Sequence, residues 1–346
     1  MNPPIIAFFN NKGGVGKTSL VYHLAWMYFD LGLKVVAADL DPQANLTAAF
    51  LDEDRLEEIW EENDADNYDT VFRCVKPLLS GIGDIATPTL EKIEDGLSLL
   101  IGDLQLSGFE DELSSQWPDC LDGKERAFRV ISAFWRVLTQ SASSHDADVI
   151  LVDLGPNLGA INRAALIAAD YIVVPLSPDL FSLQGLKNLG PTIRRWRKEW
   201  QKRIPENRAA NLTLPEGRMQ PIGYVILQHG IRYDRPVKAF QRWIERIPHI
   251  YNTEVIQSPD RPDLSPLSDP NRLALLKHYQ SLMPMAQESH KPIFHLKPAD
   301  GAIGSHVYAV RNVYRDFNHL AQEIANRIEL SLPDAQLILE PKIKAS

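Results

Sequence analysis

Two lysines stand five residues apart in the stretch NNKGGVGKTS at residues 10–19. The stretch follows the apolar run 5–9 and precedes residues with helical spacing, so it predicts a strand, a glycine-rich turn and a helix. Backbone N–H groups in such a turn point at a bound phosphate, and the helix N-terminus adds partial positive charge. Lys17 would reach the β- and γ-phosphates, and the Thr18 hydroxyl would bind Mg²⁺. These roles leave Lys12 unexplained.

Carboxylates follow two other apolar runs. Asp39 and Asp41 stand two residues apart in VVAADLDPQANLT, and Asp153 occupies the same kind of position in DVILVDLGP. Alternation along a strand puts Asp39 and Asp41 on one side, facing the crevice where open parallel sheets bind ligands. Three such strand ends beside one phosphate loop would gather carboxylates around a Mg²⁺ ion. Aspartates at strand ends also commonly cap the next helix, which is the alternative interpretation.

The elements that would position these residues alternate between short β-branched runs and helical stretches. This pattern predicts an α/β fold with a doubly wound, mainly parallel sheet flanked by helices. One helix is expected over Thr18–Leu31, with Gly32 as its stop. The expected strands are Ile5–Phe9, Lys34–Ala38, Leu97–Ile101, Val149–Val152, Tyr171–Val174, Tyr224–Leu227 and Glu254–Gln257.

The rest of the chain is less regular. Residues 51–95 are acidic and weakly periodic, which predicts helices and loops. The prolines and turn formers of 204–221 predict a loop, and 258–272 is interpreted as a surface insertion. We therefore expect one domain over 1–330, with insertions near 51–95 and 204–280, and a tail at 331–346.

Composition narrows the class of protein. The chain has 346 residues, 45% of them hydrophobic, and a formal net charge of -9, which excludes a surface that is basic throughout but not a local basic patch. Its two cysteines are too few for a disulfide framework or a metal cage. No apolar stretch reaches the roughly 18 residues that span a bilayer, and the chain enters a strand at once. These features predict a cytoplasmic protein.

The run KGGVGKTS resembles the deviant phosphate loop of the ParA/MinD family, because Asn11 and then Lys12 stand where the usual pattern begins with glycine. The resemblance implies an ATP- and Mg²⁺-dependent ATPase with slow intrinsic turnover that forms a homodimer when ATP is bound. It also implies that Lys12 reaches across the dimer into the partner's nucleotide, much as an arginine finger acts in trans. The expected nucleotide contacts are Lys12, Gly13, Gly14, Val15, Gly16, Lys17, Thr18 and Ser19.

The carboxylate segments are similar to the same family. By this resemblance Asp153 holds a metal-bound water, Asp39 supports the metal shell, and Asp41 orients the attacking water. The family more often has two prolines soon after the aspartate of the second segment, whereas Gly155 stands here, so the shape of that loop is open. Lys12, Lys17 and Asp41 are therefore the expected catalytic residues.

Further segments extend the resemblance to about three quarters of the chain. DLFSLQGLKNL at 179–189 looks like the family's segment after its fourth core strand, and residues 284–324 look like its C-terminal turn and closing helix. The family forms the edge of its adenine pocket from the end of the strand at 224–227 and the loops after it. Gln228 is the candidate that this implies.

The basic run at 191–204 is a candidate surface for binding a negatively charged partner. If the run is a helix, Ile193, Trp196, Trp200 and Ile204 form one apolar stripe, and the basic side chains cover the other faces. Such a face can neutralise DNA phosphates without reading sequence, or it can simply be a solvated surface. The resemblance implies non-specific DNA binding from this region and from the C-terminal part. The candidates are Arg194, Arg195, Arg197, Lys198, Lys202 and Arg203, with Arg311 and Arg315.

The resemblance leaves two functions open. In the first, the protein is a ParA-like ATPase that binds nucleoid DNA and positions cargo, with hydrolysis stimulated by a ParB-like or other protein. In the second, the same ATPase regulates a protein complex, in polysaccharide synthesis or defence, without DNA. Membrane attachment would need a basic amphipathic C-terminal helix, which Pro333 and Pro341 disfavour. The nitrogenase-reductase branch would need cysteines that bridge a metal cluster just after VDLGPNLG, and none stands there, so this branch is not expected. Longer partition ATPases carry a DNA-reading domain before the phosphate loop, and none is expected here because the loop begins at once.

Overall fold

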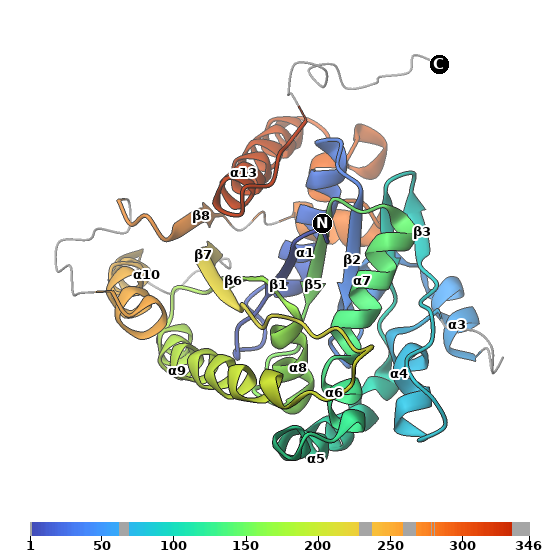
Figure 1. The fold of residues 1–346 in the computed structure, drawn as a ribbon. Coiled ribbons are helices and arrows are strands. Elements are labelled where there is room, and N and C mark those ends of the chain that lie inside the picture. The colour runs from blue at the N-terminus through green and yellow to red at the C-terminus, as the bar shows by residue number, and fades with distance from the viewer. Residues whose placement is uncertain are drawn as a thin grey trace.

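An eight-stranded sheet runs through the molecule in the order β3-β4-β2-β5-β1-β6-β7-β8 (Figure 1). The computed structural model describes residues 2–61, 69–227, 237–258, 268–277, 279 and 281–333, and every structural statement here concerns those residues. β3 is antiparallel to β4, and the other pairings are parallel. The strands are β1 (Ile5–Phe8), β2 (Val35–Asp39), β3 (Glu91–Glu94), β4 (Leu97–Leu100), β5 (Val149–Asp153), β6 (Tyr171–Leu176), β7 (Gln220–Leu227) and β8 (Arg272–Leu276).

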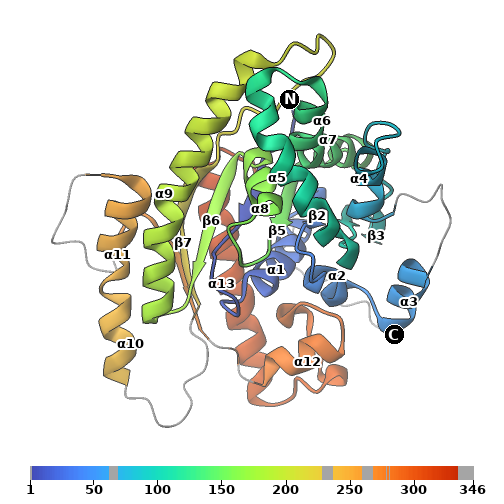
Figure 2. The same ribbon diagram turned by 90° about the horizontal axis from the view of Figure 1, so that it is seen from below.

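Helices cover both faces of this sheet (Figures 1 and 2). They are α1 (Lys17–Asp30), α2 (Asn45–Phe50), α3 (Glu53–Glu61), α4 (Val71–Leu79), α5 (Glu110–Asp119), α6 (Glu125–Ile131), α7 (Ala133–His145), α8 (Ala160–Ala168), α9 (Leu180–Arg203), α10 (Val237–Ile244), α11 (Ile247–Ile250), α12 (Leu282–Glu288) and α13 (Ser305–Arg327). In the described ranges, none of them is both long and apolar enough to cross a membrane.

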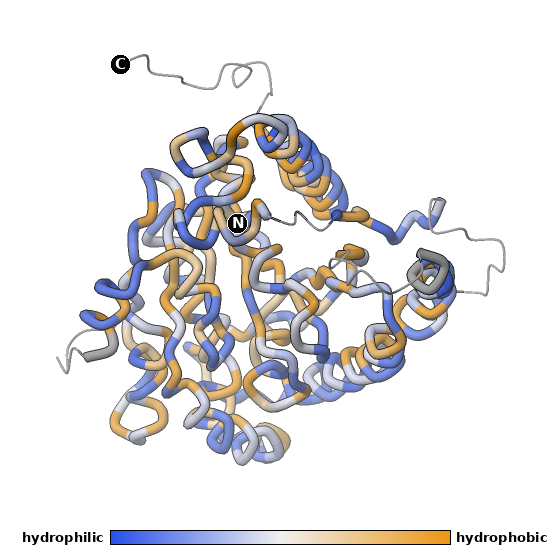
Figure 3. The backbone as a smooth tube through the Cα atoms, turned by 180° about the vertical axis from the view of Figure 1, so that it is seen from behind, coloured by the Kyte–Doolittle hydropathy of each residue, from blue (hydrophilic) through white to orange (hydrophobic). Residues whose placement is uncertain are grey.

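Alternation along the strands divides the core in two. Ile5 and Ala7 pack with α4 to α9 on one face, whereas Ile6 and Phe8 pack with α1, α2 and α13 on the other. Central strands are therefore apolar on both sides. Figure 3 shows that hydrophobic and hydrophilic residues alternate along the helices. The predicted doubly wound α/β fold is confirmed, and α1 lies within one residue of its predicted bounds.

One predicted strand is wrong. Residues 251–256 form a single π-helical segment instead of a strand at Glu254–Gln257. The segment packs on α9, where Gly190 leaves no room for a Cβ: an added Cβ would stand 2.0 Å from the Glu254 carbonyl oxygen. Tertiary packing has therefore overridden the strand propensity of Val255 and Ile256.

Two edge strands were not predicted, β3 within the acidic stretch and β8 at the end of the 258–272 insertion. β3 alternates between partly buried and exposed residues and carries charged side chains, so it lacks the apolar run of a central strand. β8 does contain an apolar run at 273–276, which was not assigned to a strand. Residues 259–267 lie outside the described residues. The predicted loop at 204–221 is confirmed as far as Met219, apart from a short 3₁₀ turn at Ile204–Glu206.

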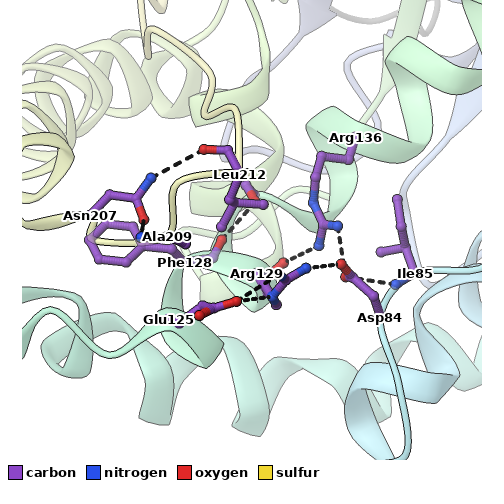
Figure 4. A network of polar contacts seen from close by, with 10 residues as sticks. Asp84, Ile85, Glu125, Phe128, Arg129, Arg136, Asn207, Ala209 and Leu212 are labelled. Carbon is purple, nitrogen blue, oxygen red and sulfur yellow. Dashed lines mark hydrogen bonds and ion pairs between the residues drawn. The ribbon is translucent and has the colours of Figure 1, made fainter.

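A polar network fastens the segment after α4 to the helices beside it (Figure 4). Asp84 accepts hydrogen bonds from Arg136 at 2.7 Å and from the Ile85 N–H at 2.8 Å, and it pairs with Arg129. Burial alone would raise the pKa of Asp84, but these hydrogen bonds and the charges of the two arginines outweigh it and lower the pKa. The irregular residues before β3 are thereby fixed against α6 and α7.

Candidate nucleotide-binding site

The glycine turn joins the end of β1 to the start of α1, as its sequence predicts. Gly14 and Gly16 adopt left-handed backbone conformations with φ of 69° and 84°, which other residues rarely adopt. An added Cβ on Gly14 would meet no atom within 4 Å, so the loop is open above this residue. No side chain caps the N-terminus of α1, and its first N–H groups are available to an anion.

Lys17 lies in the floor of this turn and is buried. Its Nζ donates to the Lys12 carbonyl oxygen at 3.4 Å. Burial lowers the pKa of Lys17, while the nearby carboxylates of Asp153 and Asp41 act in the opposite direction. A buried cation at the N-terminus of a helix is suited to a polyphosphate.

The strand ends bring Asp39 and Asp153 side by side, because these residues are paired in the register of β2 and β5. Burial raises the pKa of both carboxyl groups, and for Asp153 the charge of Asp39 adds to this. The Thr18 hydroxyl donates to Asp153 Oδ2 at 2.6 Å, whereas Asp153 Oδ1 is buried without a hydrogen-bond partner. A cation near these two carboxyl groups would stabilise their ionised forms.

These oxygens fit Mg²⁺, which is usually bound through one or two carboxylates together with substrate phosphates and water. Thr18 and Asp153 are the residues that would hold it. Within the described residues, no group of three His, Cys, Asp or Glu side chains forms a metal site by itself. The phosphates of a nucleotide would therefore complete the coordination shell.

Asp39 and Asp41 differ in their surroundings, although the sequence put both on one side. Asp39 Oδ2 accepts hydrogen bonds from the N–H and hydroxyl of Thr47, both at 2.8 Å, and Asp39 Oδ1 accepts the Asp41 N–H at 3.2 Å. Asp39 thus anchors α2 and the preceding turn. Asp41 instead lines the cavity above the phosphate loop.

That cavity has a volume of about 600 Å³, within the range of small-molecule sites. It runs from the phosphate loop, past Asp41 and Pro156, to a wall formed by α2 and α12. Figure 2 shows both of these helices near α1, with α12 below it. Of the predicted nucleotide contacts, its lining includes Gly13, Gly14, Gly16, Lys17, Thr18 and Ser19. Val15 is buried in the core and would contribute its backbone.

A second, more apolar cavity of about 180 Å³ adjoins the first at Gly16 and Ser19. Leu227, at the end of β7, and Tyr279 contribute to its lining, so the end of the 224–227 strand does face the site. An apolar cavity of this kind suits an aromatic base. Gln228, the candidate from sequence, lies outside the described residues.

His23 stands between the two cavities and contributes to both. Burial lowers its pKa to about 4, so the ring is neutral near pH 7. One ring nitrogen lies 2.7 Å from the Ser19 carbonyl oxygen, and the other accepts the Ile293 N–H at 3.2 Å. This ring therefore ties the start of α1 to the segment after α12.

Among the described residues, Lys12 is not part of the lining of the cavity above the phosphate loop. Its Nζ forms an ion pair with Asp179 of the same chain, and both side chains are partly exposed. Asp179 is also the N-cap of α9, since its Oδ1 accepts the Ser182 N–H at 2.9 Å. The two residues that follow, Leu180 and Phe181, are 53% and 72% exposed.

The basic run is helical, as predicted, and lies at the end of α9 with Ile193, Trp196 and Trp200 buried. Some of its arginines are engaged elsewhere. Arg194 donates to the carbonyl oxygen of Glu254, and Arg197 donates to that of Met219. Arg203 is buried and donates to the carbonyl oxygens of Trp117 and Glu199. The exposed basic residues of this stretch are Arg195, Lys198 and Lys202.

The sequence predicted the phosphate loop and the strand-end carboxylates, but not the surrounding residues that contact them, namely Asp179, His23 and those of α12. Asp179 is the first residue of the segment DLFSLQGLKNL and belongs to a residue type that commonly caps helices, which was a usable signal. Neither α12 nor His23 carried one, because their contribution depends on packing between distant segments. Arg311 and Arg315 are exposed on α13, on the opposite face of the sheet from α9.

A strand, a glycine turn with left-handed residues, a helix N-terminus and a buried lysine define a P-loop nucleotide-binding protein. Comparison with known proteins gives the family. A family model described as AAA domain matches residues 4–205, more than half of the chain. The chain belongs to this family and is a ParA-like P-loop protein.

Two curated relatives and a solved structure agree with this. The sporulation initiation inhibitor protein Soj of Bacillus subtilis is 30% identical over 55% of this chain and 64% of its own length. The chromosome partitioning protein ParA of Caulobacter vibrioides is 28% identical over 58% of this chain and 66% of its own. A protein from Corynebacterium diphtheriae has a TM-score of 0.64 and 26% identity, covering 94% of this chain and 98% of its own.

The match to curated relatives is incomplete. The chain spans about half to two thirds of the length of the first relatives that it matches. The part matched by the family model, residues 4–205, contains the phosphate loop, the carboxylate strand ends and α9.

Proposed function

We propose that this protein is an ATP-dependent dimerising switch that binds DNA of any sequence in its ATP state and positions DNA or other cargo. A partner protein of the ParB type, or another one, would stimulate slow, Mg²⁺-dependent hydrolysis. The observation that carries the proposal is the position of Lys12, which lies outside a phosphate cradle already served by Lys17. The names of the ParA relative and of similar partition proteins support the cargo-positioning part.

Within the site, each residue would have a separate task. Lys17 and the loop N–H groups bind the phosphates, and Thr18 and Asp153 hold Mg²⁺, which would neutralise charge on the phosphates. Asp41, which lines the cavity, would orient the attacking water, and Asp39 accepts the Asp41 N–H. The apolar cavity beside Leu227 would take the adenine ring.

The surface around Lys12 supports a second copy of the chain as partner. Leu180 and Phe181 expose apolar side chains directly beside the Lys12–Asp179 ion pair. Large exposed apolar side chains next to a functional site are typical of an interface. Lys12 would leave Asp179 when the partner's nucleotide offers it a stronger negative charge.

Replacing Lys12 with alanine should therefore prevent ATP-dependent dimerisation while leaving ATP affinity of the monomer within about threefold of the wild type, a change of less than about 1 kcal/mol. Light scattering with ATP in an Asp41→Ala background, where the dimer should accumulate, measures this. Lys34→Ala, which removes an exposed lysine paired with Asp146, is the matched control. A dimer that persists without Lys12 would refute the role in trans.

The DNA-binding surface is proposed to be the exposed stripe of α9 rather than the whole basic run. Arg195, Lys198 and Lys202 follow three- and four-residue spacing and point to solvent, whereas Arg194 and Arg197 hold backbone carbonyl groups. Two copies in a dimer would double this stripe. Arg311 and Arg315 form a separate candidate on the other face.

The triple variant Arg195→Ala, Lys198→Ala, Lys202→Ala should weaken binding to random duplex DNA uniformly and leave ATPase activity intact. The slope of the logarithm of the association constant against the logarithm of salt concentration should become shallower by about 0.9 for each DNA phosphate that the variant no longer neutralises. Fluorescence anisotropy with and without ATP measures both the affinity and this slope. The control removes the same charge from Lys34, Lys92 and Lys124, which are exposed on other elements.

The same DNA-binding assay distinguishes the proposed function from the second one, an ATPase that regulates a protein complex without DNA. The structural use of Arg194, Arg197 and Arg203 leaves a narrow basic stripe, which favours a regulatory ATPase that acts on a protein complex without DNA. Wild-type protein that shows no ATP-dependent affinity for DNA at low salt would support that alternative.

A further inference from the structure

The loop from Leu154 to Gly159 joins β5 to α8 and reaches the nucleotide cavity through Pro156. Pro156 lines the cavity and lies against Gly13 of the phosphate loop, 3.8 Å from where a Cβ of Gly13 would be. Gly155 lies so close to Asp41 that an added Cβ would stand 3.0 Å from its Oδ1. The loop is therefore in tight contact with Asp41, whereas its contact with the phosphate loop is an ordinary van der Waals one.

The far end of the loop is held by a residue from another helix. Glu110, the first residue of α5, accepts the Ala160 N–H on Oε1 at 2.5 Å and the Ile161 N–H on Oε2 at 2.8 Å. These are the first N–H groups of α8, whose own N-cap residue, Gly159, has no side chain to satisfy them. α5 and α8 lie side by side in Figures 1 and 2.

Gly159 shows how close this contact is. An added Cβ would stand 2.6 Å from Glu110 Oε1 and 2.9 Å from Asn157 Oδ1. The backbone at Gly159, with φ of -80° and ψ of -176°, is one that alanine adopts without strain. A side chain is therefore excluded by the carboxylate of Glu110 and its neighbour, and not by backbone conformation.

Two further residues of α8 hold this region together, Asn162 on the loop and Arg163 on α5. Asn162 Nδ2 donates to the carbonyl oxygens of Gly155 at 2.9 Å and Asn157 at 2.7 Å. Arg163 of α8 donates to the Leu113 carbonyl oxygen of α5 at 3.2 Å. The start of α8, the loop and the start of α5 thus form one hydrogen-bonded unit that ends beside Asp41.

We propose that Glu110 is a positioning residue for hydrolysis, which fixes the loop and through Gly155 holds Asp41 at its working distance from the nucleotide. The inference rests on the proposed ATPase function. A displacement of about 1 Å in a water-orienting group lowers a rate by up to about 100-fold, whereas the phosphate cradle does not depend on Glu110. The expected signature is a lower kcat with ATP affinity preserved.

The test compares Glu110→Ala, Glu110→Gln, Gly159→Ala and the double variant Glu110→Ala, Gly159→Ala, with kcat expressed per ATP-binding site measured by titration. Glu110→Ala should lower kcat by about 10- to 100-fold with the Kd for ATP within about twofold. Glu110→Gln keeps one acceptor oxygen and should fall between this and the wild type. Gly159→Ala should behave like Glu110→Ala, and the double variant should be no worse than either.

Asp111→Ala is the matched control, because it removes the adjacent, exposed carboxylate from the same helix turn. It should leave kcat unchanged. The inference would be overturned if Glu110→Ala kept the wild-type kcat per site, if the losses were additive in the double variant, or if kcat and ATP affinity fell equally. Wild-type protein that binds ATP but does not hydrolyse it would overturn the proposed function itself, and the positioning role with it.

Discussion

Replacing Lys17 with alanine should abolish ATP binding. Lys17 is the buried cation of the phosphate loop, and its ammonium group lies close to the Lys12 carbonyl oxygen at the base of the cradle. The variant keeps the loop N–H groups but loses the charge that faces the β- and γ-phosphates. Loss of one partner from a buried charge pair costs about 3 kcal/mol or more, so affinity should fall by at least about 100-fold. Isothermal titration with ATP and Mg²⁺ measures it.

Two comparisons make the Lys17 result specific. Lys34→Ala removes an exposed lysine far from the cavity and should bind ATP normally. Thermal melting of the Lys17→Ala protein should retain one cooperative transition, which shows that the fold survives. Unchanged ATP affinity in a folded Lys17→Ala protein would remove the basis for the proposed function.

Replacing Asp41 with alanine should leave ATP binding and ATP-dependent dimerisation intact but lower hydrolysis by about 100-fold or more. Asp41 lines the cavity, whereas the hydrogen bonds that hold α2 belong to Asp39. The loss therefore falls on the positioning of water and not on the cradle. Phosphate release over time, at saturating ATP, measures the effect.

Asp39→Ala is the informative contrast. Its carboxylate accepts hydrogen bonds from Thr47 and from the Asp41 N–H, so its removal should lower the free energy of unfolding by about 2 kcal/mol or more. Urea denaturation of both variants separates a structural carboxylate from a catalytic one. An Asp41→Ala protein that hydrolyses ATP at the wild-type rate would assign Asp41 a structural role as well.

The sequence alone predicted the central part of the fold. Its buried strands are apolar on both faces, which makes them recognisable as continuous runs, and β1, β2 and β5 lie within one or two residues of their predicted bounds. The edge strand β3 could not be recognised in this way, because charged residues alternate along it. The two edge strands β3 and β8 pair with β4 and β7, the strands next to them at either end of the sheet order.

The basic part of α9 shows the same difference between what the sequence predicts and what only the folded structure decides. Its helical spacing and its buried tryptophans follow from the order of residues along the chain. Which arginines remain available does not, since Arg194 reaches a carbonyl group 60 residues away and Arg197 one 22 residues away. Only the folded chain separates a structural arginine from an exposed one.

By itself the sequence determined the phosphate loop, because the strand, the glycine turn and the helix are contiguous and their conformations are set by local residue types. It also indicated the carboxylates at the strand ends. The tertiary structure decided what surrounds them: the pairing of Lys12 with Asp179, the different surroundings of Asp39 and Asp41, and the hydrogen bonds from the first residues of α8 to Glu110. These contacts join residues far apart in the chain, and their partners depend on how the helices pack on the sheet.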